Sequence, residues 1–125
     1  MTHEYLLLED VLAFHDDQLA RYGGADGIRD MGQLQAALFR PQTGYYKDLI
    51  EEAAALWESL SQNHPLVDGN KRTAFAVTDT FLLINGLEIT ARPDTVWKFL
   101  MGLYESGTMN FDNIGAWLRS NTGPA

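Results

Sequence analysis

Residues 64–74, with the sequence HPLVDGNKRTA, carry the densest polar chemistry of the chain and lie between two strongly apolar segments. Pro65 and Gly69 exclude a regular helix in the first half of this stretch, whereas residues 70–85 have the periodicity of a helix. The stretch therefore predicts a loop that leads into a helix N-terminus. The first N–H groups of a helix have no partner, and the peptide dipoles add about half a positive charge there, which favours a bound anion.

Two cations, Lys71 and Arg72, follow in the first turn of this expected helix. Cations at the positive end of a helix cost roughly 0.3–1 kcal/mol each, so their presence indicates an anion with several charges, such as the phosphates of a nucleotide. Asp68 offers a carboxylate for Mg²⁺, Asn70 offers an amide near phosphate oxygens, and His64 can take a proton near neutral pH.

A plainer interpretation of the same residues stays open at this point. In that interpretation Asp68 or Asn70 only caps the helix, the basic pair is solvated and His64 is an ordinary loop residue. The basic pair favours the anion site, because a helix built only for stability carries Asp or Glu in its first turn.

The composition limits the class of protein. With 125 residues, of which 46% are hydrophobic, the chain is expected to form a single globular domain over residues 1–125. It has no cysteine, so disulfides and thiolate metal sites are excluded. No apolar run is long enough to cross a bilayer, and residues 1–5 lack the basic region of a signal peptide, which predicts a cytoplasmic protein without membrane contact. The net charge of −8 disfavours direct nucleic-acid binding.

The apolar periodicity predicts an all-α fold, a compact bundle of about six helices. The expected helices cover residues 9–21, 30–39, 48–63, 70–85, 93–106 and 111–119. The fourth is apolar on nearly all sides, which is typical of a buried central helix, here with the active loop at its N-terminus. Residues 87–91 are expected to be extended, and the tail, residues 120–125, is expected to fray.

Single residues outside this core pattern also carry expectations. Leu66 is expected to point into the core and hold the loop, and His15 to be a hydrogen-bonded packing residue because it lies among apolar neighbours on a helix. Asp79 is expected to make a structural hydrogen bond.

A turn-rich segment before the third helix contains Tyr45 and Tyr46, which fit either a flap that docks an extended partner or a surface loop with one Tyr turned inward.

The 64–74 motif resembles the signature of the Fic/Doc family, and in particular of its short death-on-curing (Doc) branch. Further segments similar to that branch are residues 9–15, 21–24, 27–30 and 53–56. The resemblance implies the Fic/Doc fold and a transferase that uses ATP and Mg²⁺. It also implies that Tyr45 and Tyr46 lie where a target-docking flap is expected.

The resemblance implies a role for each motif residue. His64 becomes the general base that takes a proton from a hydroxyl of a target protein, and Asp68 holds Mg²⁺ between two phosphates of ATP. The expected nucleotide and phosphate contacts are Gly69, Asn70, Lys71 and Arg72. In this account the reaction proceeds by positioning and electrostatic stabilisation, without a covalent intermediate.

Two positions depart from the wider Fic pattern GNGRxxR, whose members mostly transfer AMP. Lys71 stands in place of the second Gly, and Phe75 stands in place of the last Arg. In the Doc branch the Gly-to-Lys change accompanies an inverted ATP and transfer of its γ-phosphate. The resemblance therefore favours a protein Ser/Thr kinase, with a protein adenylyltransferase as the alternative.

Fic proteins that inhibit themselves carry a Ser/Thr-x-x-x-Glu helix, and none of the seven glutamates here has Ser or Thr four residues before it. Restraint is therefore expected from another chain, a Phd-type antitoxin, as in the toxin–antitoxin pairs of the Doc branch. The target that the resemblance implies is elongation factor Tu, whose phosphorylation halts translation. Two other hypotheses stay open: a non-catalytic antitoxin-binding co-repressor and, more weakly, a metal enzyme, although His64 and Asp68 are too few ligands for zinc.

Overall fold

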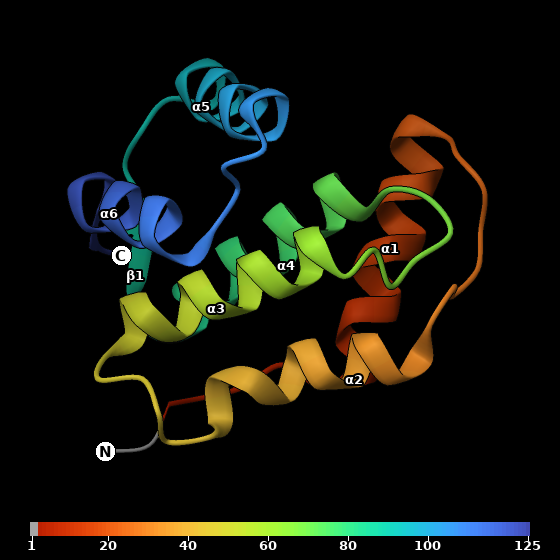
Figure 1. Cartoon of the computed structure of the whole chain (residues 1–125), viewed down its shortest axis with the longest axis horizontal. Helices are drawn as coiled ribbons and strands as arrows, with labels where there is room; N and C mark the ends of the chain where they lie inside the picture. The colour runs from red at the N-terminus through yellow and green to blue at the C-terminus, as the bar shows by residue number, and fades with distance from the viewer. Residues whose placement is uncertain (1–2) are drawn as a thin grey trace.

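The computed structural model describes residues 3–125 and confirms the helical fold expected from the sequence (Figure 1). Met1 and Thr2, which belong to the segment compared with a signal peptide, lie outside the described residues. The helices are α1 (Leu8–Tyr22), α2 (Met31–Phe39), α3 (Leu49–Gln62), α4 (Asn70–Ile84), α5 (Pro93–Ser106) and α6 (Phe111–Asn121), with a 3₁₀ turn η1 (Arg40–Gln42) and two short strands, β1 (Leu87–Ile89) and β2 (Thr122–Pro124). Within residues 3–125 no helix is both long and apolar enough to cross a membrane.

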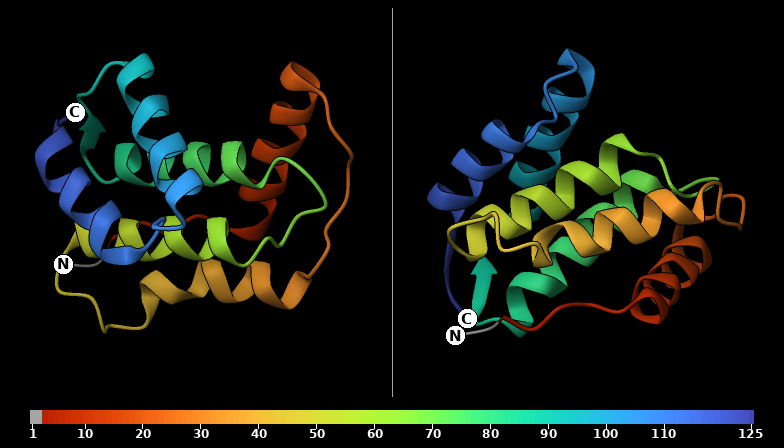
Figure 2. Two further views of the ribbon diagram at one scale, coloured as in Figure 1. Left: turned by 45° about the horizontal axis from the view of Figure 1, so that its top comes forward. Right: turned by 60° about the horizontal axis from the view of Figure 1, so that its bottom comes forward.

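Two helices, α3 and α4, form the centre of the molecule. Residues 63–69, called the motif loop here, connect them at one end (Figure 1). α3 packs against α4, α2 and α6, while α1 packs across α4 near the loop (Figure 2). The buried apolar residues of the central pair are Ala53, Ala54, Leu56, Trp57, Leu60, Ala74, Val77, Phe81 and Leu82. Alanines at the contact allow the two backbones to approach closely, which gives the loop a rigid base.

The burial of α4 is one-sided, whereas its composition suggested burial all round. Residues 73–74, 77–78 and 81–82 are buried, but Leu83 and Ile84 are 45% and 46% exposed. Leu83 follows Asp79 and Thr80 on the side away from the buried residues, and Ile84 is the last residue of the helix. Apolar residues on every side therefore did not require burial on every side, and α3 is the more deeply buried helix of the pair.

Three helices begin with the side-chain caps that polar residues before an apolar run predict. Asp30 accepts a hydrogen bond from the backbone N–H of Gln33 at 3.1 Å. Asp48 caps α3 and Asn110 caps α6 in the same way. α4 begins differently from these three helices: the residue before it is a glycine, and within residues 3–125 no side chain caps its N-terminus.

The C-terminal tail is ordered, so the expectation that residues 120–125 fray was wrong. Strand β2 pairs antiparallel with β1, which confirms the extended segment expected after α4. The N–H of Ala125 also donates to the carbonyl of Gly86 at 3.0 Å. The partner could not be predicted, because a three-residue strand that contains Gly and Pro has no alternating pattern.

Candidate active site

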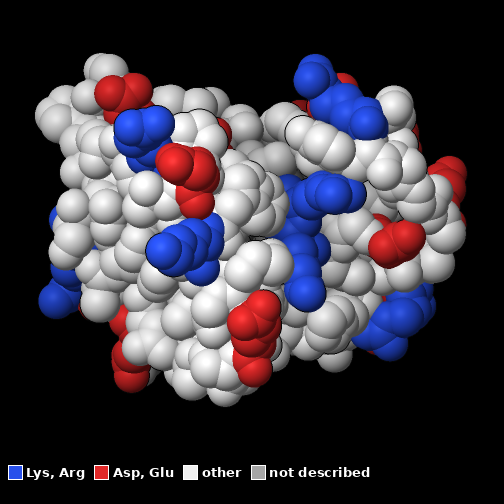
Figure 3. Space-filling model, turned by 90° about the horizontal axis from the view of Figure 1, so that it is seen from above, with Lys and Arg blue, Asp and Glu red and all other residues white. Residues whose placement is uncertain are grey.

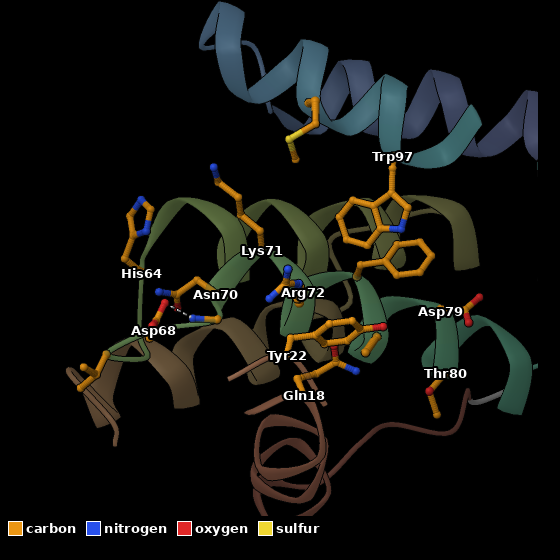
Figure 4. Close-up of a pocket in the computed structure, with 15 residues that line it drawn as sticks. Gln18, Tyr22, His64, Asp68, Asn70, Lys71, Arg72, Asp79, Thr80 and Trp97 are labelled. Carbon is orange, nitrogen blue, oxygen red and sulfur yellow. Dashed lines mark hydrogen bonds between the residues drawn. The ribbon is translucent and has the colours of Figure 1, made fainter. Parts of the chain in front are cut away.

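The motif loop opens onto a cleft of about 910 Å³. α4 forms its floor, α1 contributes Gln18 and Tyr22, and α5 contributes Trp97 and Met101 (Figure 4). Lys and Arg side chains gather where this face of the molecule is hollowed (Figure 3). All the motif residues predicted for catalysis or nucleotide binding line this cleft: His64, Asp68, Gly69, Asn70, Lys71 and Arg72.

The backbone of His64 is held in a strained conformation. Within residues 3–125 it is the only residue other than glycine with a positive φ, 45°. A left-handed backbone costs such a residue roughly 1–2 kcal/mol, so neighbouring contacts must stabilise it. Arg29 supplies them: its Nε donates to the carbonyl of His64 at 2.6 Å, and its Nη2 donates to the carbonyl of Asn63 at 2.7 Å. Arg29 therefore fixes the backbone that carries the proposed base.

The segment before α2 gives the loop a second support. The backbone N–H groups of Arg29 and Asp30 donate to the carbonyl of Pro65 at 2.8 and 3.0 Å. Next to them, Ile28 and Leu66 form an isolated antiparallel bridge. Leu66 is 2% exposed, which confirms its predicted position in the core. The loop is thus attached on one side by backbone hydrogen bonds and on the other by a buried side chain.

Asp68 presents a carboxylate that is already oriented by backbone N–H groups. Its Oδ2 accepts from Ala25 at 3.2 Å and its Oδ1 accepts from Gly69 at 2.8 Å. These two hydrogen bonds, with smaller help from positive charge such as that of Arg72, hold the pKa of Asp68 below its usual value. A Cβ at Gly24 would lie 2.8 Å from Oδ2, so the close approach of this turn requires glycine. Each carboxylate oxygen retains acceptor capacity, which fits a hard cation such as Mg²⁺.

Gly69 and His15 together form the turn into α4. Gly69 has φ 75°, the left-handed conformation that favours glycine. His15 is 2% exposed, and its Nε2 donates to the backbone carbonyl of Asp68 at 2.8 Å. The prediction of a hydrogen-bonded packing residue is therefore confirmed. What the sequence did not indicate is that His15 bonds the active loop itself.

Asn70 uses its side chain to close the loop. Its Oδ1 accepts from the N–H of Leu66 at 3.0 Å, and its Nδ2 donates to the carbonyl of Leu66 at 3.0 Å. The predicted contact between Asn70 and phosphate oxygens stays a prediction, and the second hydrogen on Nδ2 is the one available for it. The pair of bonds to Leu66 gives Asn70 a structural role that the motif alone did not show.

The N-terminus of α4 has the properties of an anion site. Within residues 3–125 the backbone N–H groups of residues 70–72 have no hydrogen-bond acceptor, and neither Asp68 nor Asn70 caps the helix. The plainer interpretation, in which one of these two residues only caps the helix, is therefore wrong on that point. Lys71 Nζ lies 4.7 Å from the ring centroid of Tyr104, and the Arg72 guanidinium lies 4.3 Å from that of Tyr22. These cation–π contacts orient both cations at the cleft.

Aromatic and apolar side chains line the cleft beyond the basic residues. Phe75, which stands where the wider Fic pattern has Arg, lies 5.7 Å from the Trp57 ring and 5.5 Å from the Trp97 ring. Trp97 and Met101 are 36% and 37% exposed. The cleft therefore changes from cationic to aromatic along α4.

The two tyrosines of the predicted flap do not line this cleft. Tyr45 and Tyr46 border a separate hollow of about 520 Å³ near the start of α6. Tyr46 turns inward: its hydroxyl accepts from Arg40 Nε at 2.6 Å, and its ring lies 5.6 Å from Phe111. Tyr45 is 84% exposed. The structure thus has the loop with one inward Tyr that the sequence left as an alternative, while docking by Tyr45 and Tyr46 remains a prediction.

The fold and the cleft define a class: small helical proteins with a His-bearing loop that enters the uncapped, basic N-terminus of a central helix. The sequence model described as "Fic/DOC family" matches residues 5–82, and the chain belongs to that family. A protein named "Toxin Doc" from Mycolicibacterium smegmatis (strain ATCC 700084 / mc(2)155) is 50% identical over 93 residues, which cover 70% of this chain and 69% of the relative. "Protein kinase doc" from Escherichia phage P1 is 34% identical over 90 residues, 69% of this chain and 71% of the relative. These matches confirm the Doc branch expected from the motif.

Proposed function

We propose that this protein is the toxin of a toxin–antitoxin pair and transfers the γ-phosphate of ATP to a Ser or Thr hydroxyl of elongation factor Tu, which arrests translation in the cytoplasm. The names of the two relatives, one a toxin and one a protein kinase, support the toxin and the kinase parts of this proposal. The target and the ATP dependence come from the family resemblance.

The observation that carries the proposal is the position of a possible base beside an anion site in one cleft. His64 is exposed to the cleft on a rigid loop, and the free N–H groups of α4 with Lys71 and Arg72 follow at the same end. Phosphoryl transfer requires positioning and electrostatic stabilisation more than covalent chemistry. The arrangement supplies both.

The reaction proposed here needs one proton acceptor and a set of positive groups. The hydroxyl oxygen of the target attacks the γ-phosphorus, its proton passes to the imidazole of His64, and the bond from the γ-phosphorus to the β,γ-bridging oxygen breaks so that ADP leaves. Lys71 and Arg72 stabilise the charge on the phosphate oxygens. When bound at Asp68, Mg²⁺ would neutralise phosphate charge. Asn70 and Arg29 keep the loop in place.

The aromatic residue at position 75 supports γ-phosphate transfer over AMP transfer. In the wider Fic pattern an arginine there extends the anion site along the helix. Here Phe75 packs between Trp57 and Trp97, so the cations of the cleft floor are confined to the first turn of α4. The terminal phosphates of ATP are then best placed at that turn, beside His64.

We further propose that a Phd-type antitoxin restrains the enzyme, because the Ser/Thr-x-x-x-Glu element of self-inhibiting relatives is missing from this sequence. Direct nucleic-acid binding is not part of the proposal, in keeping with the net charge of −8.

A growth experiment tests the catalytic part of this proposal. Wild-type protein and His64→Ala are expressed from an inducible promoter at equal levels, and protein synthesis is followed by amino-acid incorporation. We expect arrest with the wild type and uninterrupted synthesis with His64→Ala. Equal arrest by both would contradict catalysis by His64 and would favour the non-catalytic binding hypothesis.

A further inference from the structure

One face of α4 forms the floor of the cleft from end to end. The floor residues are Arg72, Phe75, Ala76, Asp79 and Thr80. Their spacing of three, four, seven and eight residues from the first is that of a single helix face. The floor is therefore ordered: a cation at the loop end, an aromatic ring and a small residue in the middle, and two polar groups at the far end (Figure 4).

Asp79, at the far end, has no hydrogen-bond partner among the described residues. Within residues 3–125 no donor lies within hydrogen-bond distance of its carboxylate, so the structural hydrogen bond expected from the sequence is absent. The side chain is half-buried, and burial raises the pKa of Asp79 above its usual value. A partly desolvated carboxylate without a donor is unfavourable. Such a group in a cleft is suited to a ligand that brings its own N–H donor.

An apolar surface lies between Asp79 and the cations. The indole of Trp97 and the ring of Phe75 lie 5.5 Å apart at 49°, and Met101 is next to them on the α5 wall. Trp97 and Met101 remain more than one-third exposed although both are large and apolar. Aromatic faces of this kind stack planar heterocycles, because every base has a π-face.

The distance along α4 fits a nucleotide. From Asn70 to Asp79 the helix rises about 14 Å, at 1.5 Å per residue. This span is comparable to the length of an extended nucleoside triphosphate from its terminal phosphate to the far edge of its base. The order of the floor groups, cation then aromatic then carboxylate, follows the order of phosphate, ring and base edge.

We propose that the far end of the cleft is the nucleobase subsite, where the base lies against Trp97 and the exocyclic amino group of adenine donates to Asp79. This inference rests on the proposed use of ATP and adds the groups that select it. A guanine bound in the same orientation would present its carbonyl oxygen to Asp79, and a carboxylate repels that oxygen. With the base at Asp79, the γ-phosphate is the phosphate nearest His64, and the α-phosphate lies farther along α4.

The test separates the two ends of the ligand. Calorimetry with Mg²⁺ measures the binding of ATP, GTP and inorganic triphosphate, which has phosphates but no base, to the wild type, Asp79→Asn and Trp97→Leu. Asn can donate to the guanine carbonyl. We expect Asp79→Asn to weaken ATP about tenfold, because the amide oxygen of Asn is a neutral acceptor and a weaker one than the carboxylate, and to lower the ATP-over-GTP preference at least as much. Triphosphate binding should stay within twofold.

Two further variants complete the design. Trp97→Leu should also weaken ATP and leave triphosphate unchanged, and Asp94→Asn, the same substitution at an exposed position outside the cleft, should change neither. Unchanged ATP affinity and ATP-over-GTP preference in Asp79→Asn would overturn the base subsite while leaving the proposed function intact. Equal loss of ATP and triphosphate binding in Asp79→Asn would also overturn it, because the effect would not be local. If the wild type bound neither ATP nor inorganic triphosphate, that result would contradict the proposed function itself, and not only the base subsite.

Discussion

Arg29 should control activity although it does not line the cleft. The perturbation is Arg29→Ala, which removes the two hydrogen bonds to the carbonyls of His64 and Asn63 at 2.6 and 2.7 Å. His64 then has no side-chain support for its φ of 45°. We expect the loop to relax toward an ordinary backbone conformation, in which the imidazole leaves its place beside the anion site.

The size of the effect follows from the two bonds. Each exposed hydrogen bond from a charged donor contributes about 1 kcal/mol net, so the pair contributes about 2 kcal/mol. This is similar to the strain of roughly 1–2 kcal/mol in a left-handed non-glycine residue. Loss of about 2 kcal/mol lowers the equilibrium constant for the active loop about 30-fold. Because the strain of roughly 1–2 kcal/mol is then no longer offset, kcat should fall by roughly 5- to 30-fold. The backbone bonds of Arg29 and Asp30 to Pro65 should survive, so the fold should persist.

The assay is phosphate transfer from Mg²⁺-ATP to elongation factor Tu at saturating and limiting ATP. Arg29→Ala should lower kcat, while the affinity for inorganic triphosphate changes less than threefold, because Lys71 and Arg72 remain. The matched control is Arg21→Ala, which removes an exposed salt bridge with Asp17. Its kcat should stay within twofold of the wild-type kcat. A kcat for Arg29→Ala within twofold of the wild type would refute the argument that this side chain holds the loop.

Three more changes have defined outcomes. Asn70→Ala should lower the free energy of unfolding by about 1–3 kcal/mol through the lost bonds to Leu66, measured by urea denaturation; a loss below 0.5 kcal/mol, roughly the size of an ordinary surface change, would count against the loop-closing role. Asp68 has its pKa lowered from 3.8, so its stabilising effect is full above pH 3.8 and lost as pH falls through the lower folded pKa. The stability difference between the wild type and Asp68→Asn should therefore shrink below pH 4, and a pH-independent difference would contradict the sign. Deletion of residues 122–125 removes β2 and should lower Tm by several degrees in calorimetry, whereas an unchanged Tm would mean that the strand pair does not contribute.

The parts of the site that the sequence predicted are those that lie together in the chain. His64, Asp68 and Arg72 fall within nine consecutive residues, and the loop-to-helix transition between Pro65 and Gly69 places them at one helix end. The helices could also be predicted from the sequence, because each buries one face whose apolar residues recur at regular spacing. In both cases local pattern and final structure agree.

The parts that could not be predicted come from distant segments. Arg29 reaches the loop across 35 residues of sequence, and Gly24 leaves room for the Asp68 carboxylate across more than 40. Trp97 reaches the cleft only because α5 lies across the cleft from α1. Such contacts depend on how helices are arranged, which periodicity does not specify. The position of the hollow beside Tyr45, separate from the cleft, is another feature that the sequence could not predict.

The most direct test of the central claim is the fate of each phosphate of ATP. Purified protein and elongation factor Tu are incubated with Mg²⁺ and ATP labelled at either the α- or the γ-phosphate, with His64→Ala as the control. Label that reaches the target only from γ, and only with the wild type, is the result predicted by a base at His64 and a cationic site confined to the start of α4. Label that arrives only from α would contradict the account and make the protein an adenylyltransferase.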